Sequence, residues 1–228
     1  MPRFRCVTGV FTFVTVAAGC YPLAAHPTRV VNGGAWGMTA GGQVARTTPD
    51  SGTSHITFIP NVSLQFVIGA RDSLRTDAVA TRFSFGAALS GFGWGAYAEF
   101  PEDFLGETDA GFGVSGQYGS AFTTVMPYFQ FGRRLSANGS WLVSQGVSMV
   151  STGDSLGWSP LMATTLGLSA ERPWFSGVMF MTFLAGNRTF EYRCGVCVSR
   201  GVIGRSFILF GVSNAFRRGP SQTIPRRR

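Results

Sequence analysis

The feature that most constrains this chain is the strict two-residue alternation across residues 78–100 (AVATRFSFGAALSGFGWGAYAEF). Successive side chains of a β-strand point to opposite faces of a sheet, so the alternation predicts a hairpin with two unlike faces. We place the turn at Ser90-Gly91, because glycine readily adopts the positive φ that two-residue hairpins need. In that register Arg82 lies directly opposite Glu99, which predicts an ion pair.

The two faces of this hairpin differ in chemistry. One face carries Phe, Trp, Leu and Val, and the other carries Gly, Ser, Arg and Glu. A water-soluble barrel would turn its apolar face inward and show a polar face, usually rich in Lys, Glu and Asp, to water. A transmembrane barrel turns its apolar face to lipid and lines its lumen with the small and polar face. The pattern favours the transmembrane barrel and leaves the soluble, ligand-binding barrel as the alternative.

The same alternation recurs along residues 33–216. It predicts an all-β fold, a closed antiparallel up-and-down transmembrane barrel of about ten strands, with eight as the alternative. The polar positions of different strands agree on one inward face. These inward residues are Gln43, Asn61, Gln65, Arg82, Glu99, Gln117, Gln130, Ser144 and Thr165. The predicted strands are 33–45, 55–70, 78–89, 92–100, 110–122, 124–135, 140–151, 160–171, 175–194 and 197–216.

Composition excludes several classes of function. The chain of 228 residues has 19 basic residues, all of them Arg, so chemistry that needs a lysine is excluded. The net charge of +8 is concentrated at the two ends. A basic charge confined to the ends argues poorly for nucleic-acid binding. The sequence contains no apolar run of 18 residues, and so no predicted membrane-spanning helix.

The amino terminus has the pattern of an export signal over residues 1–19. Arg3 and Arg5 precede an apolar run at 6–18, and small residues lead up to Cys20. The tetrapeptide Ala-Ala-Gly-Cys resembles the lipobox of bacterial lipoproteins, which implies that Cys20 is lipidated and becomes the first mature residue. An ordinary cleaved signal is the alternative. Residues 20–32 are then predicted to be a tether, and the Arg-rich residues 217–228 a disordered tail.

The overall pattern resembles small bacterial outer-membrane β-barrel proteins. The segment 206–216 (SFILFGVSNAF) is similar to their last strand, with Phe216 preceded by apolar residues at alternate positions. Twelve residues follow Phe216, whereas the last strand usually ends such chains. The resemblance implies a location in the bacterial outer membrane, with membrane lipids and the outer-membrane insertion machinery as partners.

Besides Cys20, two cysteines remain after the signal, and both lie at the tip of the predicted last hairpin. With its turn at 195–196, Cys194 lies opposite Cys197 and Glu191 opposite Arg200. An oxidising compartment favours a disulfide between the two cysteines. A reactive pair and a metal site stay open, but the only histidines are His26 and His55, and zinc would need two further ligands. We predict no metal and no cofactor.

A catalytic site is not indicated. The run around Ser213-Asn214 resembles the motif of lipid A deacylase barrels, but Gly211 stands where that motif has its histidine base. We therefore predict a non-enzymatic barrel with a structural, surface-interaction or narrow-pore role, for small solutes or an unknown surface ligand. The alternatives are a soluble periplasmic lipoprotein barrel that binds an apolar ligand and a lipid-modifying outer-membrane hydrolase.

Overall fold

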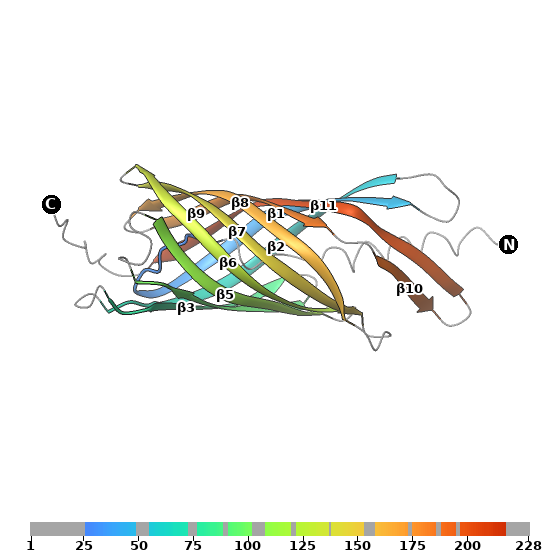
Figure 1. The fold of residues 1–228 in the computed structure, drawn as a ribbon, viewed down its shortest axis with the longest axis horizontal. Coiled ribbons are helices and arrows are strands. Elements are labelled where there is room, and N and C mark those ends of the chain that lie inside the picture. Colours follow the sequence, from blue (N-terminus) through green and yellow to red (C-terminus); the bar gives the residue numbers. More distant parts are fainter. Residues whose placement is uncertain are drawn as a thin grey trace.

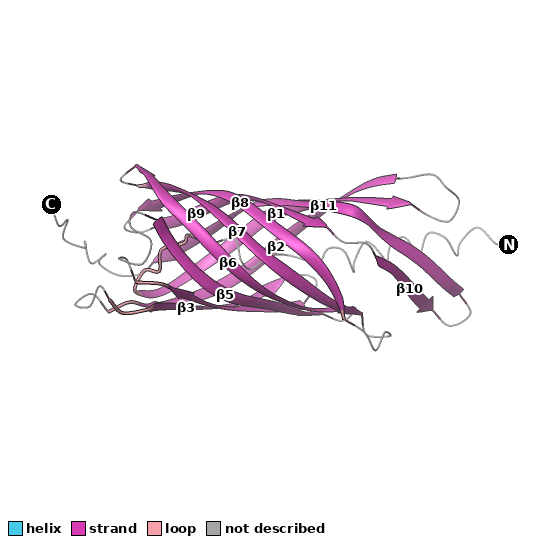
Figure 2. Cartoon of the chain, in the orientation of Figure 1, coloured by secondary structure: helices cyan, strands magenta, loops and turns pink. Residues whose placement is uncertain are grey.

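The computed structural model describes residues 26–48, 55–72, 77–88, 91–101, 108–119, 122–136, 138–152, 158–172, 175–185, 188–194 and 197–217. The regular structure in this part of the chain is entirely β (Figure 1; Figure 2). Its strands are β1 (Gly33–Thr48), β2 (His55–Ala70), β3 (Ala80–Ala88), β4 (Gly91–Glu99), β5 (Thr108–Gly119), β6 (Phe122–Ser136), β7 (Gly139–Thr152), β8 (Ser159–Arg172), β9 (Phe175–Ala185), β10 (Arg188–Cys194) and β11 (Cys197–Arg217). No helix in the described residues is long and apolar enough to cross a membrane.

The sheet closes on itself. Strands β1 to β9 pair antiparallel in chain order, β9 pairs with β11, and β11 pairs with β1. Within the described residues the closed circle therefore holds ten strands, as the alternation predicted. Strand β10 continues from β9 and pairs with the first part of β11, so that this hairpin extends past the barrel (Figure 1). The protein is an antiparallel up-and-down transmembrane β-barrel.

The side chains of the barrel wall are sorted as the sequence predicted. Large apolar side chains cover the outside, among them Trp36, which is 65% exposed, and Phe92, which is 70% exposed. Predicted inward residues such as Gln65, Gln117 and Gln130 are buried. A water-soluble barrel has the opposite distribution, so the outer surface is one that lipid covers. Further exposed apolar residues are Leu64, Phe83, Phe85, Trp94, Phe112, Phe129, Phe131, Leu166, Leu168 and Met179.

The register of the first hairpin differs from the prediction. Ala88 pairs with Gly91, and the expected opposition of Arg82 and Glu99 is wrong. Arg82 lies opposite Tyr97, and Glu99 lies opposite Ala80. A shift of two positions leaves every side chain on the face it had, which is why the alternation could not detect it.

The strand register predicted for the last hairpin is confirmed. Phe175 lies opposite Phe216, and Cys194 opposite Cys197. Alternation could not separate the two faces of residues 175–186, which are apolar throughout. The structure turns Val178, Phe180 and Leu184 inward; the odd-numbered Met179, Met181 and Phe183 are exposed outside.

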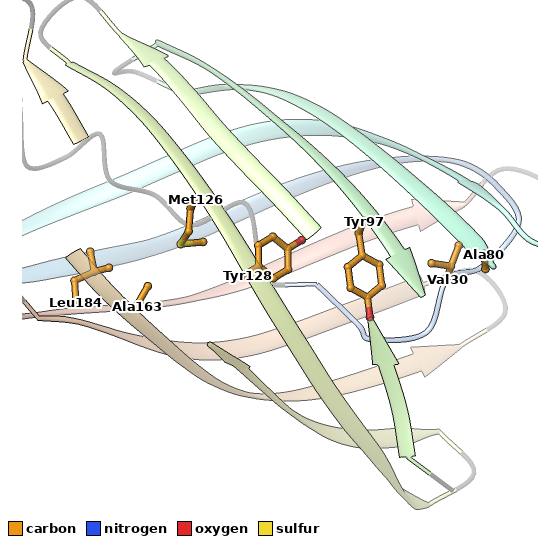
Figure 3. Close-up of a cluster of buried hydrophobic side chains, with 7 residues drawn as sticks. All are labelled: Val30, Ala80, Tyr97, Met126, Tyr128, Ala163 and Leu184. Atoms are coloured by element: carbon orange, nitrogen blue, oxygen red, sulfur yellow. The ribbon is translucent and has the colours of Figure 1, made fainter. Parts of the chain in front are cut away.

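The lumen is a packed core. A buried apolar cluster crosses it, made of Val30, Ala80, Tyr97, Met126, Tyr128, Ala163 and Leu184 (Figure 3). Two tyrosine rings lie over inward-facing glycines of β5. A Cβ on Gly111 would lie 2.4 Å from the Tyr97 hydroxyl, and one on Gly113 would lie 2.3 Å from the Tyr128 ring. The glycine-rich inner face thus makes room for large side chains that fill the barrel.

Candidate functional site

The most informative site is the chain segment that occupies one end of the lumen. Residues 26–32, which we call the strap, precede β1 and lie inside the barrel. His26, Thr28 and Val30 are each 3% exposed or less. The sequence predicted a tether over residues 20–32, which follow the predicted signal and include Pro22 and Pro27. The structure places the described part, residues 26–32, inside the lumen.

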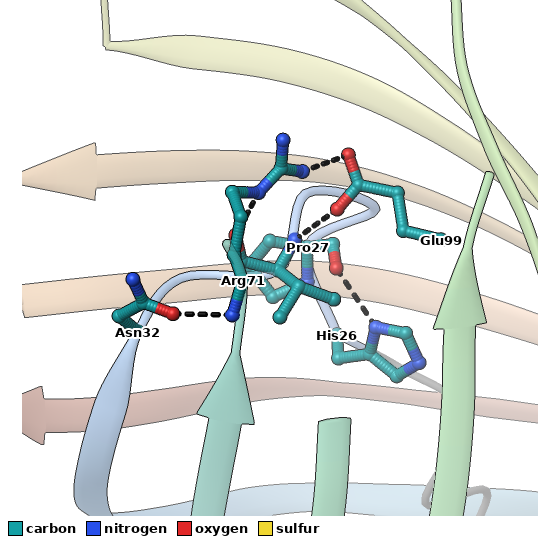
Figure 4. A network of polar contacts seen from close by, with 6 residues as sticks. His26, Pro27, Asn32, Arg71 and Glu99 are labelled. Atoms are coloured by element: carbon teal, nitrogen blue, oxygen red, sulfur yellow. Dashed lines mark hydrogen bonds and ion pairs between the residues drawn. The ribbon is translucent and has the colours of Figure 1, made fainter. Parts of the chain in front are cut away.

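Arg71 and Glu99 form a buried ion pair (Figure 4). Each of the two side chains also binds one backbone polar group of Val30. The Val30 N–H donates to Glu99 Oε2 at 2.6 Å, and its carbonyl accepts from Arg71 Nε at 3.1 Å. The Arg71 guanidinium also pairs with Glu99 Oε1. The strap backbone, the cation and the carboxylate therefore form one closed ring of contacts. Just beyond it, the Arg71 backbone N–H donates to Asn32 Oδ1.

This ring explains how Glu99 is tolerated inside the barrel. Its side chain is 1% exposed, and a buried carboxylate is costly unless charged and hydrogen-bonded partners surround it. Sequence analysis identified Glu99 as a lumen residue but assigned it Arg82 as the partner. It missed Arg71, which lies just after β2 in a stretch that looked like a polar turn. No periodic signal marks Arg71, because its role depends on the strap.

A second set of contacts fixes the start of the strap. Gln130 Nε2 donates to the His26 carbonyl at 2.7 Å and to Thr28 Oγ1 at 3.1 Å. The His26 ring lies edge-on to Tyr97, with centroids 4.6 Å apart, and its Nε2 is 2.8 Å from the Tyr128 hydroxyl. Its Nδ1 is 2.8 Å from the Pro27 carbonyl. A carbonyl can only accept, so we assign the proton to Nδ1, and Nε2 accepts from Tyr128 in the neutral ring.

His26 is held in its neutral form. Burial lowers the pKa of the His26 imidazole well below its usual value, and the positive charge of Arg82 acts in the same direction. The hydrogen bond to the Pro27 carbonyl opposes the shift but is the smaller effect. The strap is therefore docked with an uncharged histidine between two tyrosines.

Two glycines of the wall leave room for the strap. A Cβ on Gly69 would lie 2.1 Å from the Val31 carbonyl oxygen, and a Cβ on Gly132 would lie 2.3 Å from Thr28 Oγ1. Contacts this short are incompatible with a side chain at either position. The inner wall is therefore shaped for a chain that lies against it.

The other side of the strap faces a small cavity. Odd-numbered residues Pro27, Arg29 and Val31 line it, together with wall residues that include Arg82 and Ser176. Its volume is about 30 Å³, enough for a water molecule. Even-numbered strap residues thus pack against the wall of β4 and β6, and odd-numbered ones face the cavity.

The structure describes some of the remaining predicted site residues and not others. Cys194 and Cys197 are directly opposite in the register, but their side chains lie outside what is described, so the disulfide stays a prediction. Cys20 precedes the described residues, and its lipidation also stays a prediction. Ser213 lies opposite Thr39 and Val178, so neither register neighbour is a histidine. Among the described residues, no group of three or more His, Cys, Asp or Glu could hold a metal ion.

The comparisons with known proteins concern the fold. No protein-family model matches the sequence, and no curated protein matches it either. Solved structures that match include the KdgM porin (11% identity, TM-score 0.37) and the KdgM porin in complex with disordered oligogalacturonate (11%, 0.40), each covering 78% of this chain and 99% of the other. Another is Ail, the attachment invasion locus protein of Yersinia pestis, in complex with the heparin analogue sucrose octasulfate (16%, 0.28), covering 80% and 99%.

These likenesses are too distant to assign a role, so the assignment rests on the chain's own strand pairing and surface. In the described residues ten antiparallel strands, an even number, close into a barrel. Its outer surface is apolar, and its inner surface carries small and polar side chains that are packed together. These are the properties of bacterial outer-membrane barrels. The protein is a β-barrel of the bacterial outer membrane.

Proposed function

We propose that the protein is a narrow outer-membrane pore that its own strap closes. The docking of Val30 between Arg71 and Glu99 carries this proposal, because it places in one end of the lumen a segment that is not part of the barrel wall. The strap has no strand ladder to hold it. Strands β1 to β9 pair continuously without it, so the sheet can stay folded when the strap leaves.

Planar-bilayer conductance of the purified full-length protein tests closure. In the Val30→Asp variant, a carboxylate would face Glu99 at a buried position, and repulsion should expel the strap. We expect little conductance from the wild type and stable steps from Val30→Asp. Val31→Asp is the matched control, since it puts the same charge on the next residue, whose side chain lines the cavity with Arg82. Equal conductance of wild type and Val30→Asp would refute closure by the strap.

A second candidate role is interaction at the cell surface through the β10–β11 hairpin. The hairpin stands beyond the barrel wall (Figure 1). Its sequence from 188 to 206 carries four Arg and one Glu, which suits an anionic surface ligand. Substituting Arg193 and Arg200 by Gln in the full chain should then weaken binding of whole cells to a polyanion and leave conductance unchanged.

We further infer that Cys20 is lipidated, that the chain is inserted by the outer-membrane insertion machinery, and that the barrel has no enzymatic activity. The lipobox resemblance supports the first, and the missing base beside Ser213 supports the last. Cys20→Ala should remove the mass of the acyl groups from the mature protein. Ser213→Ala should leave the envelope lipids unaltered.

A further inference from the structure

We propose that the lumen end around Glu99 is a binding site for a short peptide, and that the strap is its resident occupant. The inference rests on the proposed closure by the strap and adds the class of ligand. Displacement of the strap would expose a site that another peptide of the same kind can fill.

Recognition at this site is directed mainly at the peptide backbone. The wall binds three main-chain groups of the strap: the Val30 N–H, the Val30 carbonyl and the His26 carbonyl. Bonds to main-chain groups can supply affinity for a peptide, since every peptide carries these groups. A site of this kind accepts a chain that can adopt the path of the strap.

Contacts of the wall then select the side chains at positions 26, 28 and 30. His26 fits beside Tyr97 and Tyr128, whose rings lie 6.3 Å apart and nearly parallel. Thr28 fits over Gly132 and accepts from Gln130. Val30 belongs to the apolar cluster that contains Ala80. The preferred peptide has an aromatic or imidazole ring, then a small hydroxyl side chain two positions on, then a β-branched aliphatic side chain.

The site also has hydrogen-bonding capacity that the strap does not use. The Tyr97 hydroxyl and Gln130 Oε1 are buried, and neither finds a hydrogen-bond partner among the described residues. Gly111, which the Tyr97 hydroxyl covers, is the register partner of Gln130. Both polar groups therefore lie over the same part of the wall. Buried polar groups are costly when unsatisfied, so this surface suits a ligand with further polar groups.

Binding of a labelled synthetic peptide tests the inference. The probe is the blocked octapeptide HPTRVVNG, which copies residues 26–33, and the receptor is the full-length Val30→Asp protein in detergent. Fluorescence anisotropy should show at least tenfold tighter binding to Val30→Asp than to the wild type, whose own strap competes. The same octapeptide with aspartate in place of the valine at its fifth position, and a scrambled octapeptide, should not bind.

A receptor variant shows whether the peptide occupies the predicted site. Adding Gln130→Ala to the Val30→Asp chain removes the donor to two strap groups, and the affinity should fall at least tenfold. Heat-modifiable migration on gels checks that each barrel is folded. If Val30→Asp does not fold, Thr28→Arg expels the strap in another way, because Gly132 leaves no room for the longer side chain.

The two proposals fail separately. If the expelled-strap variant conducts and the octapeptide both binds and blocks the current, both stand. If it conducts and the octapeptide does not bind, the peptide site is wrong and closure by the strap stands. If the variant does not conduct and the octapeptide still binds with loss in Gln130→Ala, closure is wrong and the peptide site stands.

Discussion

The backbone N–H of Val30 donates a 2.6 Å hydrogen bond to the carboxylate of Glu99, across 69 positions of sequence. This contact joins the strap, which is not part of the barrel wall, to the inner face of β4. It also decides the environment of Arg71, which pairs with the same carboxylate and binds the Val30 carbonyl. The contacts that hold the strap in the lumen are therefore made by the same two side chains, Arg71 and Glu99, whose opposite charges neutralise each other there.

Removing Glu99 should be strongly destabilising. Glu99→Ala leaves the Arg71 guanidinium, whose side chain is 14% exposed, without this carboxylate, and we expect a loss of about 3–5 kcal/mol in the free energy of unfolding. Urea unfolding followed by tryptophan fluorescence measures it. Adding Arg71→Ala should recover part of the loss, since the pair acts together. The exposed control Arg172→Ala should stay within about 0.5 kcal/mol of wild type. A loss as small as this in Glu99→Ala would contradict the ring of contacts.

The glycines of β5 should not tolerate a methyl group. In Gly113→Ala the new Cβ would lie 2.3 Å from Tyr128 Cζ, so the ring must move, and we expect a loss of about 1–3 kcal/mol. The same urea titration provides the measurement. Gly34→Ala is the control, because its nearest neighbour, a Phe66 ring atom, is 3.3 Å away. In a Tyr128→Ala background the Gly113→Ala change should cost almost nothing further, and a persistent cost would show that the ring is not its cause.

Closure should weaken in acid. The docked His26 has a lowered pKa, whereas an undocked histidine titrates near about 6.5. Below that pH the undocked strap binds a proton that the docked strap does not, so falling pH favours the undocked state. Conductance of the wild type should rise between about pH 7.5 and pH 5. Groups that contact His26 or act on its charge include Arg82 from β3, Tyr97 from β4 and Tyr128 from β6.

The control for this acid effect is His26→Gln, which keeps a polar side chain but does not titrate in this range. Its conductance should change less with pH than that of the wild type. The main alternative explanation of an acid effect is protonation of Glu99, which would also release Val30. An unchanged pH profile in His26→Gln would assign the effect to that carboxyl and not to the imidazole.

The β10–β11 hairpin should carry a disulfide. Cys194 and Cys197 are directly opposite in the register, a spacing at which the bond forms readily, and the compartment is oxidising. Alkylation of the protein from native membranes should label neither cysteine until a reductant is added, and intact mass reads the result. The bond closes a very short loop, so Cys194→Ser with Cys197→Ser should cost only about 2 kcal/mol. Two labelled thiols without reductant would disprove the bond.

The faces of the wall were set by local sequence. Because side chains alternate along a strand, residues such as Trp36 and Gln130 could be assigned outward and inward without knowing any neighbour. The same period made the exact register invisible. Moving Glu99 from Arg82 to Ala80 is a shift of two, which keeps each residue on its face.

The occupant of the lumen was decided only by tertiary structure. Nothing local marks Val30 as buried or Arg71 as its partner, because their contacts depend on which chain lies inside the closed barrel. Gly69 and Gly132 lie against the strap, and nothing in the local sequence separates them from the other glycines of the wall. A two-residue period determines which way a side chain points. Which distant segment meets it is decided when the barrel closes and buried polar groups must find partners.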